Sequence, residues 1–179
     1  MTKWVAFLRA INLGSTNKVP MAELRELMTG MGYGDVRTFL QSGNATFASE
    51  KRKATQLEEE FAAALTERFG FAIPVMVRSA DDLSAVVDGN PFPGSPGIEP
   101  KQLHVAFLSV DPSAAHLEAL DATAYEPDEF ALGDRVVYLR LPDGVQGSRL
   151  PAAMEKALGV RSTMRTWNTV TRLLALATD

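Results

Sequence analysis

An almost unbroken run of apolar residues occupies Trp4–Ala10, and a polar loop follows it. Both alternating faces of the run are apolar, which predicts a strand covered on both sides. Pro20 suits the first position of a helix, leucines and methionines from Met21 to Met31 form its apolar stripe, and Gly30, Gly32 and Gly34 are predicted to end it.

The rest of the first half predicts a hairpin, a helix, a strand and another helix. The hairpin strands are 36–41 and 45–48, separated by Ser-Gly-Asn. Thr55 and Glu58 have the spacing of a capping box at the start of the next helix. A short strand is predicted over Ile73–Val77, and Ser79 is predicted to cap a helix that runs to Val87.

The same order of elements returns in the second half. Strands are predicted at 103–109, 129–132, 136–141 and 163–166, and helices at 111–120, 148–158 and 168–177. Val105-Ala-Phe-Leu108 repeats Val5-Ala-Phe-Leu8 letter for letter, and Thr163-Met-Arg-Thr166 resembles Met76-Val-Arg-Ser79 in kind.

Each half therefore reads as β-α-β-β-α-β followed by one more helix, which is the ferredoxin-like arrangement. The fold class that we predict is α+β, with a tandem duplication of two ferredoxin-like subdomains. Residues 89–100 are rich in proline and glycine, so no regular structure is predicted for them. The predicted domains are 1–88, a linker at 89–100, and 101–179.

Composition and charge exclude several classes of function. The 179 residues include no cysteine, which excludes disulfides and zinc-thiolate sites and fits a cytoplasmic protein. The formal net charge of −4 disfavours a nucleic-acid partner. No apolar stretch is long enough to span a membrane. His104 and His116 lie far apart in sequence, so no metal site is predicted, and no cofactor is expected.

One polar cluster is predicted where the first strand ends and the third begins. Arginine, lysine, small amides and glycine N–H groups suit a phosphate or a carboxylate. The candidate ligand-binding residues are Arg9, Asn12, Lys18, Gln41, Ser42 and Asn44. The alternative interpretation is structural: the Asn and Gly residues make turns, and Arg9 pairs with a carboxylate on a helix.

A second polar cluster lies near the C-terminus. Arg165 ends a strand, Thr166 or Asn168 can cap the last helix, and the ring of Trp167 can stack on a planar group. A helix N-terminus beside an arginine suits an anion, so Arg165, Trp167 and Asn168 complete the candidate set. The alternative is a plain N-cap with Trp167 in the core.

Several of these motifs together resemble a known bacterial family. They are Arg9-Ala-Ile-Asn12-Leu-Gly14, Lys18-Val-Pro-Met21, Gln41-Ser-Gly-Asn44 and Arg165-Thr-Trp-Asn-Thr169. The sequence resembles the domain of unknown function 1697 (DUF1697) family over nearly the whole chain. This resemblance implies an α/β duplication and brings no established activity.

Three functional hypotheses follow. The first is a cytoplasmic protein, either a binding protein or an enzyme of unnamed reaction type, that binds a small anionic or nucleotide-like molecule at the polar loops. The second is a protein-interaction or structural protein. The third is a single-stranded RNA-binding module, which the pI of about 5.3 and the lack of an aromatic RNA-reading motif disfavour.

Overall fold

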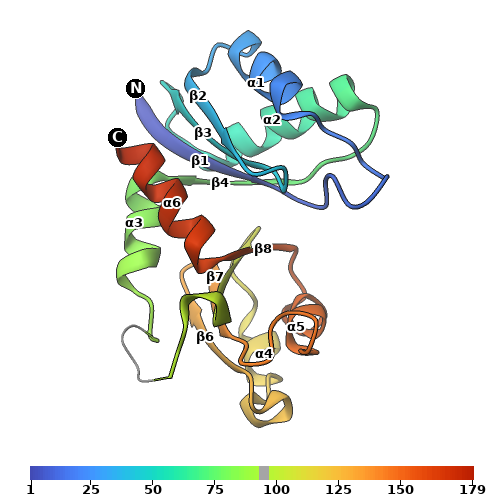
Figure 1. Cartoon of the computed structure of the whole chain (residues 1–179), viewed down its shortest axis with the longest axis vertical. Helices are drawn as coiled ribbons and strands as arrows, with labels where there is room; N and C mark the ends of the chain where they lie inside the picture. Colours follow the sequence, from blue (N-terminus) through green and yellow to red (C-terminus); the bar gives the residue numbers. More distant parts are fainter. Residues whose placement is uncertain (93–96) are drawn as a thin grey trace. The chain divides into compact units, whose positions relative to one another are not determined.

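A computed structural model describes residues 1–92 and 97–179, which separate into two compact units (Figure 1). Unit 1 contains Met1–Ser84 and Arg172–Asp179, and unit 2 contains Ala85–Thr171. Two helices, α3 (Ala80–Asp88) and α6 (Trp167–Thr178), have residues in both units. Each unit has its own four-stranded antiparallel sheet, so the chain is a mixed α+β protein.

The sheet of unit 1 has the order β2-β3-β1-β4. Its elements are β1 (Thr2–Leu8), α1 (Met21–Gly30), β2 (Gly34–Phe39), β3 (Asn44–Ser49), α2 (Ala54–Phe69) and β4 (Val75–Ser79), followed by α3. The central strand β1 is antiparallel to both neighbours, and Val5 is paired with Thr46 on one side and Arg78 on the other.

The sheet of unit 2 has the equivalent order β6-β7-β5-β8. Its elements are β5 (Leu103–Leu108), α4 (Ala114–Glu118), β6 (Glu129–Gly133), β7 (Val136–Arg140), α5 (Leu150–Leu158) and β8 (Ser162–Thr166), followed by α6. Here Val105 is central and pairs with Tyr138 and Arg165.

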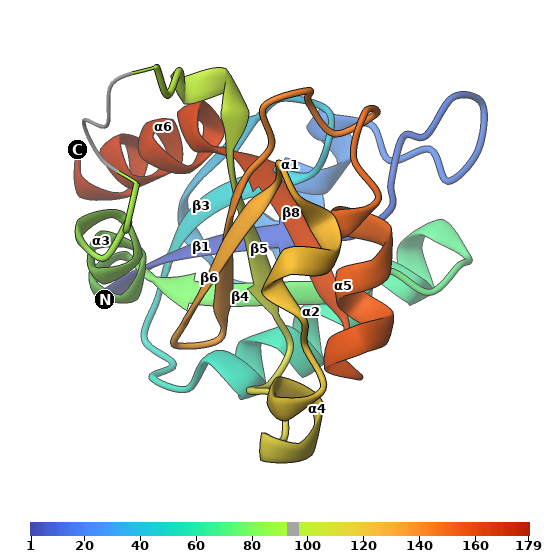
Figure 2. The same ribbon diagram turned by 90° about the horizontal axis from the view of Figure 1, so that it is seen from below.

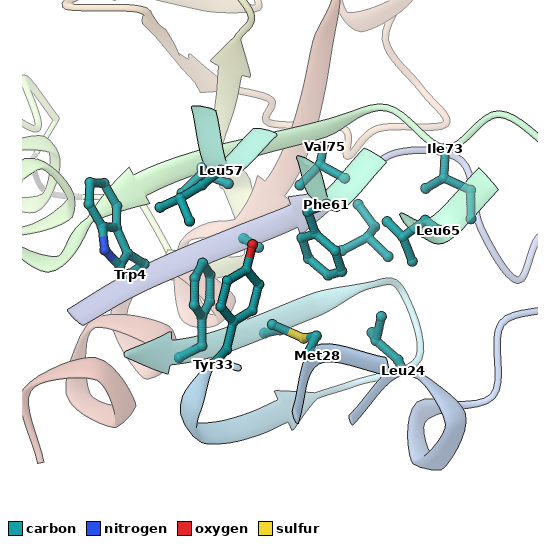
Figure 3. Close-up of a cluster of buried hydrophobic side chains, with 14 of the residues drawn as sticks. Trp4, Leu24, Met28, Tyr33, Leu57, Phe61, Leu65, Ile73 and Val75 are labelled. Carbon is teal, nitrogen blue, oxygen red and sulfur yellow. The ribbon is translucent and has the colours of Figure 1, made fainter. Parts of the chain in front are cut away.

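One face of the β1 sheet forms the hydrophobic core of unit 1. Trp4, Ala6 and Leu8 alternate onto this face and pack with buried residues of α1 and α2, which lie on one side of the sheet (Figures 1 and 3). Tyr33 stacks on Phe47 with ring centroids 4.6 Å apart and meets the edge of Phe61 at 6.2 Å. The apolar periodicity of the sequence therefore becomes the contact between the helices and the sheet.

A hydrophobic cluster in the core of unit 2 is built around α5. Alternate residues of β5 and β7 pack against Leu150, Met154 and Leu158, whose spacing places them on one side of the helix. Figures 1 and 2 show α5 beside the sheet of this unit. The helix ends at Gly159, which has a φ of 67° and donates its N–H to the carbonyl of Glu155.

Element order agrees with the prediction, whereas some ends differ. The first strand stops at Leu8 instead of Ala10, because the N–H of Arg9 donates to the Pro74 carbonyl and Ala10 turns the chain with a φ of 57°. Pro20 is the N-cap of α1 instead of its first helical residue.

The predicted capping box at Thr55 is wrong. The helix begins at Ala54, and its N-cap, Lys53, makes no side-chain cap hydrogen bond. Glu58 is used elsewhere: its Oε1 accepts the N–H of Val77 at 2.8 Å and lies 3.6 Å from Nη1 of Arg78. The cap predicted at Ser79 is confirmed, since its hydroxyl accepts the N–H of Asp82 at 3.0 Å.

The predicted linker at 89–100 falls partly on residues 93–96, which lie outside the described residues. At its end, Pro100–Gln102 forms a short 3-10 helix, η1, and a second one, η2, spans Ala122–Tyr125. The sequence patterns predicted neither. Within residues 1–92 and 97–179, no helix has both the length and the apolar character that crossing a membrane requires.

Candidate functional site

The segment after β1, residues 9–20, is here called the strand-end loop. Two buried residues anchor it in the core of unit 1: Ile11 is 2% exposed and Val19 is 1% exposed. The residues between them, 13–18, are exposed. In both whole-chain views the loop extends from the end of β1 (Figures 1 and 2). The loop is therefore a solvent-facing excursion with both ends fixed.

The side chain of Asn12 holds the base of the strand-end loop together. Its Oδ1 accepts the N–H of Val19 at 2.8 Å, and its Nδ2 donates to the Val19 carbonyl at 3.0 Å. The same Nδ2 donates to the Gln41 carbonyl at 2.6 Å. Gln41 belongs to the turn between β2 and β3, residues 40–43, here called the hairpin turn. One amide thus joins the two segments.

The tip of the strand-end loop is ordered by further hydrogen bonds within it. The N–H of Asn12 donates to the Asn17 carbonyl at 2.9 Å, and the Asn17 side chain donates to the Ala10 carbonyl at 3.1 Å. The N–H of Thr16 donates to the Leu13 carbonyl at 3.1 Å, and the Lys18 ammonium donates to the carbonyl of Gly14. These bonds hold the tip in one shape.

Backbone strain is concentrated in these two segments. Of the six non-glycine residues with positive φ in the described part of the chain, four lie here: Ala10, Asn12, Asn17 and Leu40. Asparagine tolerates this conformation, but for alanine and leucine it costs about 1 kcal/mol or more. Such strain persists only where surrounding contacts over-determine the backbone, and it is common at functional sites.

The hairpin turn is packed directly against the end of β1. The Gly43 carbonyl accepts the N–H of Leu8 at 2.8 Å. A Cβ atom on Gly43 would lie 2.8 Å from Cβ of Leu8, and the φ of 93° also requires glycine. Asn44 is fully buried and donates to the Phe39 carbonyl at 2.8 Å and to Oγ of Ser42 at 3.0 Å. The sequence-based expectation that this turn lies near Asn12 is confirmed.

The predicted residues of the first cluster thus divide into two groups. Asn12 and Asn44 use their amides within the protein, as the structural interpretation expects. Arg9 is half-buried, and Lys18, Gln41 and Ser42 are exposed, so these four present polar groups at the surface. Their hydroxyl, amide and cationic donors suit an anionic group.

In the second predicted cluster the cap expected at Thr166 is confirmed, and Arg165 is buried. Arg165 is 8% exposed in β8, where its Nη1 donates to Oγ1 of Thr163 at 2.8 Å and to the Met164 carbonyl at 2.9 Å. Burial lowers the pKa of Arg165 to about 10. Thr166 caps α6 by accepting the N–H of Thr169 at 3.3 Å. Trp167 is half-buried and Asn168 exposed at the start of that helix.

A buried arginine at the equivalent position of unit 1 was missed by the sequence reasoning. Arg78 is 1% exposed, pairs with Glu58, and donates from Nη1 to the preceding carbonyl, Val77 O, at 2.9 Å, as Arg165 does with Met164. The sequence feature that could have indicated this is the match between Arg78-Ser79 and Arg165-Thr166 at the ends of the last strands of the two halves. Within the described residues, no group of three or more His, Cys, Asp or Glu is placed to hold a metal ion.

Comparisons with known proteins place the chain in a family. The family model described as "Protein of unknown function (DUF1697)" matches residues 1–138. Among solved structures, the conserved bacterial protein SP0830 from Streptococcus pneumoniae is similar, with a TM-score of 0.79 and 22% identity over 100% of this chain and 99% of that one. No curated protein matches the chain.

The structural likeness, at 22% identity, establishes the fold alone. The family match contains the strand-end loop and the hairpin turn, and it ends before the Arg165–Thr169 motif. The resemblance stated from the sequence is confirmed over the matched residues, and the chain belongs to the DUF1697 family.

Proposed function

We propose that unit 1 binds a small anionic or nucleotide-like molecule over the strand-end loop and the hairpin turn. Arg9 and Lys18 supply positive charge, and Gln41 and Ser42 orient the ligand. Asn12 and Asn44 support these residues by fixing the backbone. No general acid and base pair is assigned at these residues, so the function that we infer is binding by a cytoplasmic protein, with no reaction assigned.

Charge is the observation that carries this proposal. The strand-end loop and the hairpin turn contain two cations, Arg9 and Lys18, and no carboxylate, in a chain with a net charge of −4. An electropositive surface of ordered backbone, rich in turn residues, suits a phosphate or carboxylate. The hydrogen bonds of Asn12 already fix the backbone. The two segments therefore lose little conformational entropy when a ligand binds.

Unit 2 provides an internal comparison. The N–H of Leu108 donates to the Arg135 carbonyl at 2.8 Å, in the same way that Leu8 donates to Gly43. Here residues 109–113 and the turn 134–135 are shorter than their counterparts and contain Asp111 and Asp134. The shared strand order therefore does not require the strand-end loop and the hairpin turn of unit 1 to be longer than their counterparts or to lack acidic residues.

We also infer that the two units are ferredoxin-like subdomains related by tandem duplication. The shared strand order, with the first strand of each unit at an inner position, supports this origin. The identical Val-Ala-Phe-Leu segments occupy β5 and β1, and each valine is paired with an arginine of the last strand. The boundaries 1–88, 89–100 and 101–179 remain part of this proposal.

The test is a thermal-shift panel of pyrophosphate, nucleotides, sugar phosphates and dicarboxylates. A ligand present at about 100 times its Kd stabilises the protein by roughly 2.7 kcal/mol, which raises the melting temperature by several degrees. Arg9→Ala and Lys18→Ala should abolish the shift, whereas Arg52→Ala, which removes an exposed cation outside both loops, should keep it. Equal shifts in all three variants would overturn the assignment.

A protein-interaction role is the second candidate, and two exposed leucines favour it. Leu13 on the strand-end loop is 60% exposed, and Leu40 on the hairpin turn is 54% exposed. Apolar side chains gathered on one surface mark interaction sites, and these two leucines lie on segments that the Asn12 amide joins. A Leu13→Ser, Leu40→Ser double variant should then lose partner binding in sedimentation experiments while it keeps the ligand-induced thermal shift. If the double variant loses the ligand-induced thermal shift together with partner binding, the same surface serves both functions.

A further inference from the structure

A surface cavity of about 850 Å³ lies in unit 2, and no residue of the strand-end loop or the hairpin turn lines it. It is lined by η2, the segment that follows it, β6 and β7, with Phe92 also contributing. This volume is in the range of small-molecule sites, which is about 300–1,000 Å³. The cavity therefore has the size to hold a compact organic ligand.

Acidic side chains dominate the polar lining of this cavity. Glu126, Asp128 and Glu129 contribute three carboxylates, and Arg140 contributes the one cationic side chain in the lining described. Arg140 is already paired with Glu129, with Nη1 3.3 Å from Oε2. The remaining carboxylates leave the lining with an excess of negative charge, which favours a cationic ligand.

One of the lining carboxylates, Asp128, is held in place by hydrogen bonds. Asp128 is 7% exposed, donates its N–H to the Tyr125 carbonyl at 2.9 Å, and accepts the hydroxyl of Ser148. Oγ of Ser148 in turn accepts the N–H of Leu150 at 3.0 Å, at the start of α5. This carboxylate is therefore positioned by the fold rather than by solvent.

Two further features narrow the class of ligand. Phe92 and Phe130 line the cavity, and aromatic faces attract both apolar groups and ammonium ions. The Nε of Arg140 is buried and has no hydrogen-bond partner among the described residues. A buried donor without an acceptor is costly, so an acceptor oxygen on a ligand would be bound favourably there.

We propose that this cavity is a binding site for a small primary amine that has an apolar body and a carbonyl oxygen near the ammonium group. The ammonium is held by Glu126 and Asp128, the apolar body lies against Phe92 and Phe130, and the carbonyl oxygen accepts from Nε of Arg140. The site is separate from the anion site proposed for unit 1, and neither depends on the other.

Three probes of one shape separate these contributions. Phenylalaninamide carries both the ammonium and the carbonyl, 2-phenylethylamine lacks the carbonyl, and 3-phenylpropionamide lacks the ammonium. Titrations followed by amide chemical shifts of the labelled full chain should give affinities that fall in that order. The largest shifts should come from residues 122–131. Tighter binding of the neutral amide than of both amines, or shifts confined to other residues, would overturn the proposal.

Matched variants assign the contacts. Glu126→Gln should weaken both amines about fivefold, the size expected for losing one partly exposed charge interaction. Glu118→Gln, an exposed acid on α4 outside the lining, should leave both affinities unchanged. Arg140→Lys keeps a cation beside Glu129 but removes Nε, so it should abolish only the advantage of phenylalaninamide over 2-phenylethylamine. Unchanged affinities in Glu126→Gln would exclude the carboxylate contact, and with it the site.

Discussion

Asn12 and Val19 are joined by two hydrogen bonds between one side chain and one backbone unit, with Oδ1 accepting from N at 2.8 Å and Nδ2 donating to O at 3.0 Å. The Asn12 side chain makes the pair of hydrogen bonds to the Val19 backbone that a neighbouring strand would make in a sheet. It closes a loop whose ends are both buried in the core, and through the Gln41 carbonyl it also holds the hairpin turn. The shape of the proposed anion site therefore depends on this one amide.

Replacing Asn12 by alanine should destabilise unit 1. The substitution leaves the N–H and the carbonyl of Val19 and the Gln41 carbonyl without this partner, which should cost about 2 kcal/mol in the free energy of unfolding. Asn17→Ala, which removes one exposed hydrogen bond to Ala10, is the matched control and should cost less. Urea denaturation measures both, and an Asn12→Ala loss no larger than that of Asn17→Ala would contradict this account.

A methyl group at Gly43 should be tolerated poorly. Gly43→Ala combines a φ of 93° with a Cβ placed 2.8 Å from Cβ of Leu8 and 2.9 Å from Cδ1 of Ile11. Gly32→Ala provides the control, because Gly32 has a φ of 87° but nothing within 4 Å of the added Cβ. Both variants are destabilised by the conformational strain, and only Gly43→Ala is also destabilised by overpacking. Overpacking typically costs about 1–3 kcal/mol, so the free energy of unfolding of Gly43→Ala should be lower than that of Gly32→Ala by roughly this amount.

Two buried tyrosine hydroxyls should respond oppositely to removal at neutral pH. The hydroxyl of Tyr138 donates to the Val86 carbonyl at 2.7 Å, so Tyr138→Phe should cost about 1 kcal/mol. The hydroxyl of Tyr33 is buried and has no hydrogen-bond partner within the described residues, so Tyr33→Phe should be neutral or stabilising. Thermal melts at pH 7 distinguish the two, and equal losses would show that the Tyr33 hydroxyl is bonded in solution.

Tyr33 should also make the protein sensitive to alkali. Burial, with a smaller contribution from Glu60, raises the pKa of Tyr33 from 10.0 to about 12. Because the unfolded chain releases this proton first, stability is complete below about pH 10 and falls as the pH rises to about 12. In Tyr33→Phe this part of the decline should be absent, as measured by denaturation at several alkaline pH values. A decline identical to that of the unmodified protein would assign it elsewhere.

His104 should contribute to instability in acid. Burial lowers the pKa of His104, whose Nδ1 has no hydrogen-bond partner among the residues that the structure describes. The unfolded chain therefore takes up a proton first as the pH falls below about 6.5, and stability is lost by no more than about 1.4 kcal/mol per pH unit. His104→Gln should flatten this part of the curve, as measured by denaturation at several acidic pH values. The same slope in His104→Gln and in the unmodified protein would contradict the assignment.

The order and type of the elements could be predicted from the sequence because their causes are local. Apolar spacing defines a strand or a helix face over a few residues, and the repeated Val-Ala-Phe-Leu segments both became central strands. Ends were less predictable, since β1 stops where Arg9 meets Pro74, a residue far along the chain.

The proximity of the strand-end loop to the hairpin turn also followed from sequence, because strand order places the end of β1 beside the start of β3. The role of each polar residue did not. Asn12 binds Val19 and Gln41, and Glu58 binds the backbone of β4 instead of capping α2, through contacts that join residues 7 to 29 positions apart.

Sequence by itself thus determined the alternation of apolar and polar positions, the repeated order of elements and the basic character of the strand-end loop. Tertiary structure alone decided which polar groups are satisfied inside the protein and which face solvent. The physical reason is that a side-chain amide or guanidinium takes the partner that folding brings within hydrogen-bonding distance. Arg78, a charged residue that is 1% exposed beside Glu58, shows that local composition does not reveal that partner.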